Sequence, residues 1–233
     1  MFCTMRFENH LTTLFLFVFI RFLLTVFLVS VLPGAASLTL HGEKGGNITL
    51  ECGLSTIEDS SVLLKHGSIT AYGLQPDNQY MGRVHKSGLC DLVLQDLKTT
   101  DAGRYRLYIY EREHLMSDIS LEIHINDTLT GREGEELVFG DLPRDAESVH
   151  HQTDTGWTEV WKRGKGVLSD CLTDNDGHLI IRDFRSSDAG EYRVLNKTGG
   201  ILITLTVKES GTESKGNLNS TNDDSVDTEQ QRK

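Results

Sequence analysis

The histidine, aspartate and cysteine side chains of this chain are the residue types that could bind a metal ion or catalyse a reaction. His150, His151 and Asp154 lie within five residues of one another, and imidazole with carboxylate is a ligand combination that several metals accept. Loops of this composition are more often solvated, so we predict no metal site there. The sequence contains no His-Glu-x-x-His, no Gly-x-Ser-x-Gly and no phosphate-binding glycine loop. We therefore expect a non-catalytic protein with no metal and no cofactor.

The overall charge indicates which partners the chain does not suit. It has 34 acidic and 23 basic residues, a formal net charge of −11, and no run of five or more Lys or Arg. A net negative surface mainly favours solubility. We therefore expect no nucleic-acid partner.

Residues 1–36 are apolar and differ from the rest of the chain. Small residues precede Ser37, as they do at a signal-peptide cleavage site. The alternative is an uncleaved membrane anchor, because the 22 residues of 11–32 are long enough to span a bilayer. Arg21 in the middle of this stretch costs about 2.5–3.5 kcal/mol on insertion scales, which disfavours the anchor. We predict a cleaved signal peptide and a secreted product, bound to a membrane only if the segment is retained.

Asn-x-Ser/Thr sequons along the chain fit passage through the secretory pathway, an oxidising route in which disulfides persist. They begin at Asn47, Asn126, Asn196 and Asn219. We predict N-glycosylation at these asparagines and an extracellular location.

The C-terminal segment, residues 209–233, consists mostly of Ser, Thr, Asn, Asp, Glu and Gln. Such a segment cannot bury enough apolar area to offset the entropy lost when it becomes ordered. We expect a disordered polar tail there.

An internal repeat divides the part of the chain that remains. Segments 92–106 and 179–193 align without a gap at an offset of 87 residues, and seven of the fifteen positions are identical. The same offset relates earlier segments, so a whole domain is repeated. We predict one domain at 37–126 and a second at 127–208.

Both repeated units have the sequence pattern of β-strands. Apolar Tyr105, Leu107 and Ile109 alternate with polar residues, and segments 119–125 and 201–207 are rich in β-branched residues. No amphipathic helix of useful length competes with this pattern. Short strands in units of about 85–90 residues predict an all-β chain of two tandem β-sandwiches.

Each unit also contains an Asp-Ala-Gly-x-Tyr motif after a strand and a turn, at Asp101–Tyr105 and Asp188–Tyr192. This motif resembles the connection between strands E and F in the immunoglobulin superfamily. Glycine there allows a tight turn, and the tyrosine hydroxyl returns to the main chain upstream. The resemblance implies two tandem immunoglobulin-like, variable-type-like domains.

The resemblance implies particular contacts as well. Arg83 would pair with Asp101, a contact that contributes only about 0–1 kcal/mol if it is exposed. Trp161 would lie on strand C of the second domain. A stretched loop containing residues 150–157 would precede it.

The cysteines depart from the pattern of that family. Leu107 and Val194 stand two residues after the motif tyrosines, so neither domain has the usual bridge between strands B and F. Cys52 and Cys90 would both face inward on the neighbouring strands B and E, which leaves open either a Cys52–Cys90 bridge or two free thiols. Cys171 is then unpaired, and a dimer linked through it is a further hypothesis.

Strand F of the first domain offers a candidate binding surface. Side chains alternate along a strand, so the residues between the inward-facing ones point outward, and tyrosine and arginine dominate interface hot spots. We predict a partner-binding face made of these residues, of one strand C residue and of the loop towards strand G. Its members are Lys65, Arg104, Arg106, Tyr108, Tyr110, Glu111 and Arg112. The alternatives are solvated strand residues or contact with the second domain, which we expect to be a spacer.

A first domain without the usual bridge, followed by a second immunoglobulin domain, is similar to lymphocyte adhesion receptors of the signalling lymphocytic activation molecule type. The resemblance implies a recognition protein whose protein ligand lies on a cell surface. That ligand could be another immunoglobulin-superfamily protein or a second copy of the chain. Three forms remain open: a soluble immune receptor or decoy, an adhesion receptor held by an uncleaved N-terminal segment, and a structural matrix module.

Overall fold

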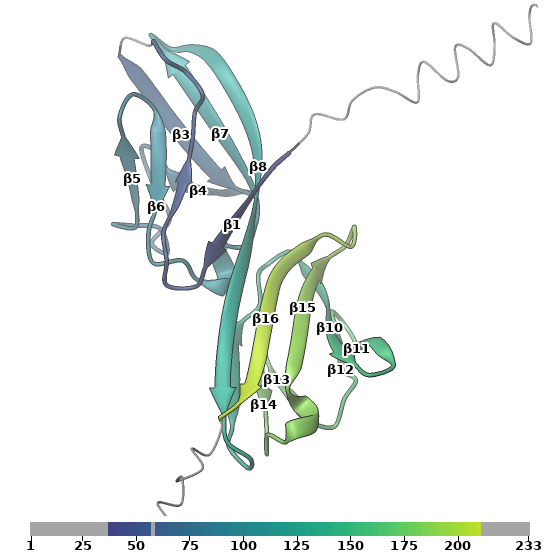
Figure 1. Ribbon diagram of the computed structural model, residues 1–233. Coiled ribbons are helices and arrows are strands. Elements are labelled where there is room, and N and C mark those ends of the chain that lie inside the picture. Colours follow the sequence, from purple (N-terminus) through teal and green to yellow (C-terminus); the bar gives the residue numbers. More distant parts are fainter. Residues whose placement is uncertain (1–36, 57–58, 211–233) are drawn as a thin grey trace, which may run out of the picture.

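The computed structural model describes residues 37–56 and 59–210, which form two β-sandwiches joined by one long strand (Figure 1). Every regular element in this part of the chain is a strand or a short 3₁₀ turn, so the predicted all-β fold is confirmed. No helix among these residues is long and apolar enough to cross a membrane. The expected signal peptide, and the expected tail from residue 211 onward, lie outside the described residues.

The first sandwich is built from the strands that precede residue 132. Their bounds are β1 Leu38–Glu43, β2 Ile48–Leu50, β3 Ser60–His66, β4 Ile69–Tyr72, β5 Val84–Ser87, β6 Asp91–Leu94, β7 Gly103–Glu111 and β8 His114–Gly131, with a 3₁₀ turn at Thr99–Asp101. A sheet in the order β2–β6–β5 faces a larger one in the order β1–β8–β7–β3–β4. This is the arrangement of strands B–E–D and A–G–F–C–C′ in an immunoglobulin domain.

The second sandwich repeats this arrangement. Its strands are β9 Leu137–Asp141, β10 Ala146–Thr153, β11 Gly156–Lys162, β12 Gly166–Val167, β13 Leu172–Asn175, β14 His178–Ile181, β15 Gly190–Asn196 and β16 Ile201–Glu209, with a 3₁₀ turn at Ser186–Asp188. One sheet has the order β13–β14–β9, and the other runs β12–β11–β10–β15–β16–β8. The fold is therefore that of two tandem immunoglobulin-like domains.

Strand β8 belongs to both sandwiches, and Figure 1 shows it running from one to the other. Its first part pairs with β7, and its last part, from Ile125 to Gly131, pairs in parallel with β16. The sequence allows this because neither glycine nor proline interrupts the strand before Gly131. The domain boundary that we expected after residue 126 lies inside this strand, and β16 extends through Glu209.

Both Asp-Ala-Gly-x-Tyr motifs form the expected tyrosine corner. The hydroxyl of Tyr105 donates a hydrogen bond of 2.8 Å to the main-chain oxygen of Asp101. Tyr192 makes the same 2.8 Å bond to Asp188. The motif glycine is needed because its φ is positive, 130° at Gly103, where a side chain would be strained. The prediction drawn from the repeat is confirmed at the level of single hydrogen bonds.

The expectation for strand C of the second domain is wrong. Residues 150–157 form no stretched loop, because β10 and β11 make a hairpin there. It is β10 that pairs with β15, and Val149 lies opposite Val194. Trp161 therefore lies on β11, one strand further out, where its indole N–H donates a 2.6 Å hydrogen bond to Asp174. The valine has no indole ring to mark strand C in the sequence.

The expected pair between Arg83 and Asp101 forms, with one guanidinium nitrogen 3.3 Å from a carboxylate oxygen. Its side chains are only 12% and 1% exposed. The contact is therefore a largely buried ion pair, and the small energy of an exposed pair does not apply to it.

Candidate protein-binding surface

The outward side of β3, β7 and β8 in the first sandwich forms an open sheet face, which we call the front face. Register places Lys65 opposite Arg106 and Leu63 opposite Tyr108. The alternate residues Tyr105, Leu107 and Ile109 are fully buried. The outward orientation predicted for strand F is thus the one in the structure.

The centre of the front face carries a small polar cluster. Arg106 forms a 2.9 Å ion pair with Asp118 of β8, and its guanidinium carbon lies 5.8 Å from the centre of the Tyr108 ring. The arginine is largely exposed, so the pair contributes little to stability. Its effect is to hold a charged group beside an aromatic ring on an accessible surface.

A hollow of about 680 Å³ lies at one end of the front face. We call it the front hollow. Its lining is Ser61, Val62, Leu63, Lys65, Thr70, Gly73, Leu74, Gln75 and Tyr110. Leu74 is fully exposed at its edge. The sequence pointed to Lys65 and Tyr110, but it did not reveal the residues from β4 and the segment after it.

The hairpin between β7 and β8 borders the same end. Its two turn residues, Arg112 and Glu113, both have positive φ, 46° and 72°, as a type I′ turn requires. The register shifts after Ile109, which places Leu115 opposite Tyr110. Directly opposite residues share a face, so this exposed leucine extends the apolar surface. Glu111 ends β7 beside the turn.

Arg104 lies at the other end of β7. It is six positions from Tyr110 in the sequence, a distance of roughly 20 Å along a strand. It faces Glu122 of β8 and lines a hollow between the two sandwiches. The structure therefore brings Lys65, Arg106, Tyr108 and Tyr110 together and sets Arg104 apart.

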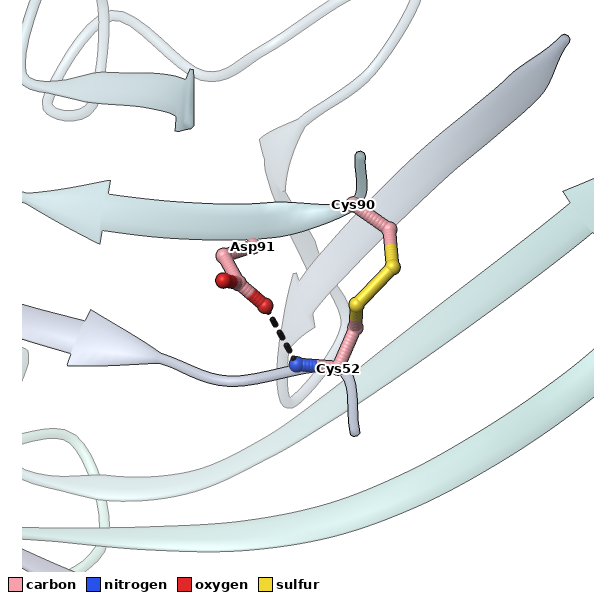
Figure 2. Close-up of side chains that lie close together, drawn as sticks. All are labelled: Cys52, Cys90 and Asp91. Carbon is pink, nitrogen blue, oxygen red and sulfur yellow. Dashed lines mark hydrogen bonds between the residues drawn. A yellow bond between two sulfur atoms is a disulfide. The ribbon is translucent and has the colours of Figure 1, made fainter. Parts of the chain in front are cut away.

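A disulfide joins Cys52, which follows β2, to Cys90, which precedes the adjacent strand β6 of the smaller sheet (Figure 2). Their Cα atoms are 5.7 Å apart, and both residues are buried. The carboxylate of Asp91 accepts a 2.8 Å hydrogen bond from the main-chain N–H of Cys52. These three residues form the only cluster of potential metal ligands among the described residues. The two sulfur atoms are bonded to each other, so they offer no thiolate for a metal.

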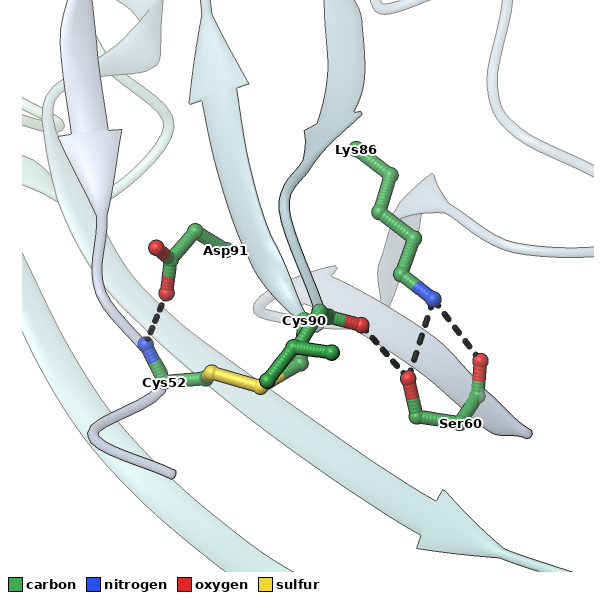
Figure 3. The surroundings of a disulfide bond; sticks show 6 residues. Cys52, Ser60, Lys86, Cys90 and Asp91 are labelled. Carbon is green, nitrogen blue, oxygen red and sulfur yellow. Dashed lines mark hydrogen bonds between the residues drawn. A yellow bond between two sulfur atoms is a disulfide. The ribbon is translucent and has the colours of Figure 1, made fainter. Parts of the chain in front are cut away.

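Polar contacts hold the chain around this bridge (Figure 3). The hydroxyl of Ser60 donates a 2.6 Å hydrogen bond to the main-chain oxygen of Leu89, and Lys86 donates to Ser60 at 2.9 Å. The start of β3 is thereby tied to the turn before Cys90. The bridge has a structural role at the end of the sandwich.

The remaining cysteine is half-buried. The Cys171 sulfur lies 2.9 Å from the hydroxyl oxygen of Ser169. Burial raises the pKa of this thiol, which lowers its thiolate fraction and its reactivity. The dimer linked through Cys171 remains a hypothesis, and this environment does not favour it.

The two histidines that could have met at a metal point to opposite faces of β10. His151 is buried and stacks on Tyr192, with ring centres 4.0 Å apart. His66 stacks on Tyr105 in the same way, at 4.3 Å. Both histidines lie opposite the motif tyrosine of their own domain. The sequence pattern did not reveal this repeated pair, because a two-residue difference in spacing removes the histidines from the gap-free repeat.

The sequon asparagines differ in accessibility. Asn47 is exposed and Asn126 is half-buried, whereas Asn196 is 7% exposed. The side-chain oxygen of Asn196 accepts hydrogen bonds from Thr198 and Gly200. This burial opposes a glycan at that position in the folded chain. Asn219 lies outside the described residues.

Comparisons with known proteins give no family assignment. No protein-family model matches the chain, and no curated protein sequence matches it. Among solved structures it is similar to the I67–I69 fragment of titin, with 14% identity, a TM-score of 0.31, and coverage of 75% of this chain and 63% of that one. Sidekick-1 immunoglobulin domains 1–4 match with 16% identity and a TM-score of 0.28, over 77% of this chain and 48% of that one. The N-terminal four immunoglobulin domains of Dscam1 isoform 6.9 match with 15% identity and a TM-score of 0.31, over 77% of this chain and 45% of that one.

The chain spans less than two thirds of each of these solved structures. The TM-scores are too low to carry an argument about function. The immunoglobulin-like fold is established by the strand order and the two tyrosine corners described above.

Proposed function

We propose that this protein is a non-catalytic extracellular recognition protein that binds a protein partner through the front face of its first domain. The observation that carries the proposal is the front hollow, in which Tyr110, Lys65 and exposed Leu74 surround an accessible depression. Interfaces gain most of their energy where an aromatic or aliphatic anchor fills such a depression and water is excluded.

The chemistry of the front face defines the partner that fits it. The hollow is lined mainly by apolar groups, and its rim carries Lys65. A partner would insert an apolar side chain and present a carboxylate to the lysine. The pair of Arg106 and Asp118 offers both signs of charge beside the hollow, which favours a defined orientation of the partner.

The partner classes follow from the same surface. A cell-surface protein with an immunoglobulin-like domain is one, and a second copy of this chain is the other. Sequence resemblance to lymphocyte adhesion receptors supports an immune role within this proposal. A structural matrix module would leave the front face without a ligand.

Cell binding by the secreted protein tests the proposal. A fluorescent tetramer of the full product is titrated onto a panel of leukocytes, and sedimentation tests self-association. We expect Tyr110→Ala to weaken binding by about 2 kcal/mol or more, roughly 30-fold. Trp157→Ala removes a partly exposed aromatic ring from the second domain and is the matched control. Equal binding by the Tyr110 variant, or an equal loss in the control, would contradict the proposed surface.

The anchored-receptor alternative concerns a different part of the chain. N-terminal sequencing of the product separates it from the secreted form, because cleavage leaves a chain that begins near Ser37. A product that retains residues 1–36 and sediments with membranes would favour the adhesion receptor.

A further inference from the structure

A second hollow, of about 460 Å³, lies where the two sandwiches meet. We call it the interdomain cleft. The first domain contributes Gly67 and Arg104. The second contributes Arg144, Asp145, Ala146, Arg163, Asn196, Lys197 and Leu202. Four basic side chains therefore surround one space together with a single carboxylate.

This concentration of positive charge is opposite to the character of the chain, whose net charge is −11. The side chains of Arg104, Arg144 and Lys197 are exposed and form no ion pair or hydrogen bond with any other described residue. Like charges gathered around one space repel each other. An anion in the cleft would relieve this repulsion.

Arg163 makes the cleft a preformed structure. Its guanidinium donates hydrogen bonds to the main-chain oxygens of Ala146, at 2.6 Å, and Arg144, at 3.1 Å. These bonds hold the loop that carries the Arg144 side chain. On the opposite wall, Asn196 is fixed by hydrogen bonds from its own turn. The cations are thus presented on an ordered frame, which lowers the entropy cost of binding.

The size and lining of the cleft indicate the class of ligand. Cavities of roughly 300–1,000 Å³ hold organic ligands, so the space is larger than a single inorganic anion requires. Among the lining residues, only Ala146 and Leu202 have aliphatic side chains. A polar ligand of the size of a sugar unit, with negative groups on more than one side, matches both properties.

We propose that the interdomain cleft binds an acidic saccharide, whose sulfate or carboxylate groups contact Arg104, Arg144 and Lys197. The site is separate from the front hollow and does not depend on the protein partner proposed above. Because both domains contribute cations, a bound saccharide would also link them.

Calorimetric titration of the full secreted protein with a heparin-derived tetrasaccharide tests this proposal. The variant Arg104→Gln/Arg144→Gln removes two cations from the cleft. Each lost charge-assisted hydrogen bond weakens binding roughly tenfold or more. We therefore expect the affinity of this variant for the tetrasaccharide to fall at least that much. The matched control, Arg132→Gln/Arg182→Gln, removes the same charge at exposed positions elsewhere and should bind like the unmodified protein. The Tyr110→Ala variant should also bind the tetrasaccharide like the unmodified protein.

Three results would overturn the proposal. The first is an absence of tetrasaccharide binding by the unmodified protein, and the second is an equal loss in the cleft variant and in the control, which would indicate general attraction. The third is binding of inorganic sulfate as tight as that of the tetrasaccharide, which would indicate a site for a free anion.

The state of Asn196 provides an independent test. A glycan on this asparagine would occupy the cleft that it lines. We expect peptide mass spectrometry of the secreted protein to find Asn196 unmodified. A fully occupied sequon at this position would contradict saccharide binding in the cleft.

Discussion

At the scale of single residues, the core of the first domain contains a hydrogen-bonded polar cluster. The Nδ1 atom of His66 lies 2.5 Å from the Tyr80 hydroxyl oxygen, which lies 3.0 Å from that of Tyr105. The imidazole ring also stacks on Tyr105. In the second domain, His151 stacks on Tyr192 in a similar way. Each tyrosine corner is thus covered by a histidine from the neighbouring strand.

Burial lowers the pKa of His66 and of His151. For His66 this effect outweighs the opposite influence of Asp145 and Asp101, while Arg144 adds to it. The unfolded chain then binds protons at a higher pH than the folded one. The stability that depends on these two histidines being neutral is therefore fully present above the ordinary histidine pKa of about 6.5. It is lost as the pH falls below that value.

We predict that acid destabilises the protein through these histidines. Urea unfolding at pH 7.5 and pH 5 should show a lower free energy of unfolding at pH 5, and His66→Gln should reduce the difference. NMR titration of the two imidazoles provides a check without any variant. Midpoints above 6.5 for both rings would refute this origin of the acid sensitivity.

The two arginine–aspartate pairs of the first domain should differ in energetic value. The pair of Arg83 and Asp101 is largely buried, whereas Arg106 in the pair with Asp118 is largely exposed. Removal of one partner from a buried pair costs about 3–5 kcal/mol, and an exposed pair contributes about 0–1 kcal/mol. We expect Arg83→Ala to lower the free energy of unfolding far more than Arg106→Ala. Similar losses of unfolding free energy for the two variants in chemical denaturation would show that burial does not determine how much each pair contributes.

At the scale of elements, the disulfide fastens two adjacent strands of the smaller sheet in the first domain. Cys52 follows β2 and Cys90 precedes β6, at a sequence separation of 38. Bridges in immunoglobulin domains usually connect the two sheets. Here Leu107 and the other buried residues of β7 join the sheets by packing alone.

We predict that loss of this bridge costs about 4 kcal/mol, the loop-closure value for a separation of this length. Cys52→Ser/Cys90→Ser should show that loss in urea unfolding under non-reducing conditions. Cys171→Ser is the control and should change stability little. Peptide mapping of the unmodified protein should recover Cys52 linked to Cys90 and Cys171 as an alkylated thiol. Any other pairing would contradict the structure.

At the scale of the whole molecule, the two domains are connected by more than the chain. Strand β8 pairs with strands of both sandwiches. Away from that strand, the hydroxyl of Thr99 donates a 2.8 Å hydrogen bond to the main-chain oxygen of Asp141. On β8 itself, the imidazole of His124 lies 2.9 Å from the hydroxyl oxygen of Thr204 on β16. These contacts join the two domains beside the pairing of β8 with β16.

Much of this arrangement could be predicted from the sequence. The repeated motif identified two immunoglobulin-like domains, because the turn and the tyrosine corner need particular residues at a fixed spacing. The alternation along β7 predicted which of its side chains face outward. The second domain was harder to predict, since an ordinary valine, Val149, stands where a tryptophan would have marked strand C.

The sequence by itself determined the fold class, the repeat and the orientation of strand F, because these depend on residues close together in the chain. Only the tertiary structure determined the front hollow, the histidine–tyrosine stacks and the interdomain cleft. Each of these joins residues that are distant in sequence, such as Lys65 with Tyr110 and Arg104 with Lys197. Their proximity follows from strand pairing and domain contact, which the spacing of residues in one sequence does not encode.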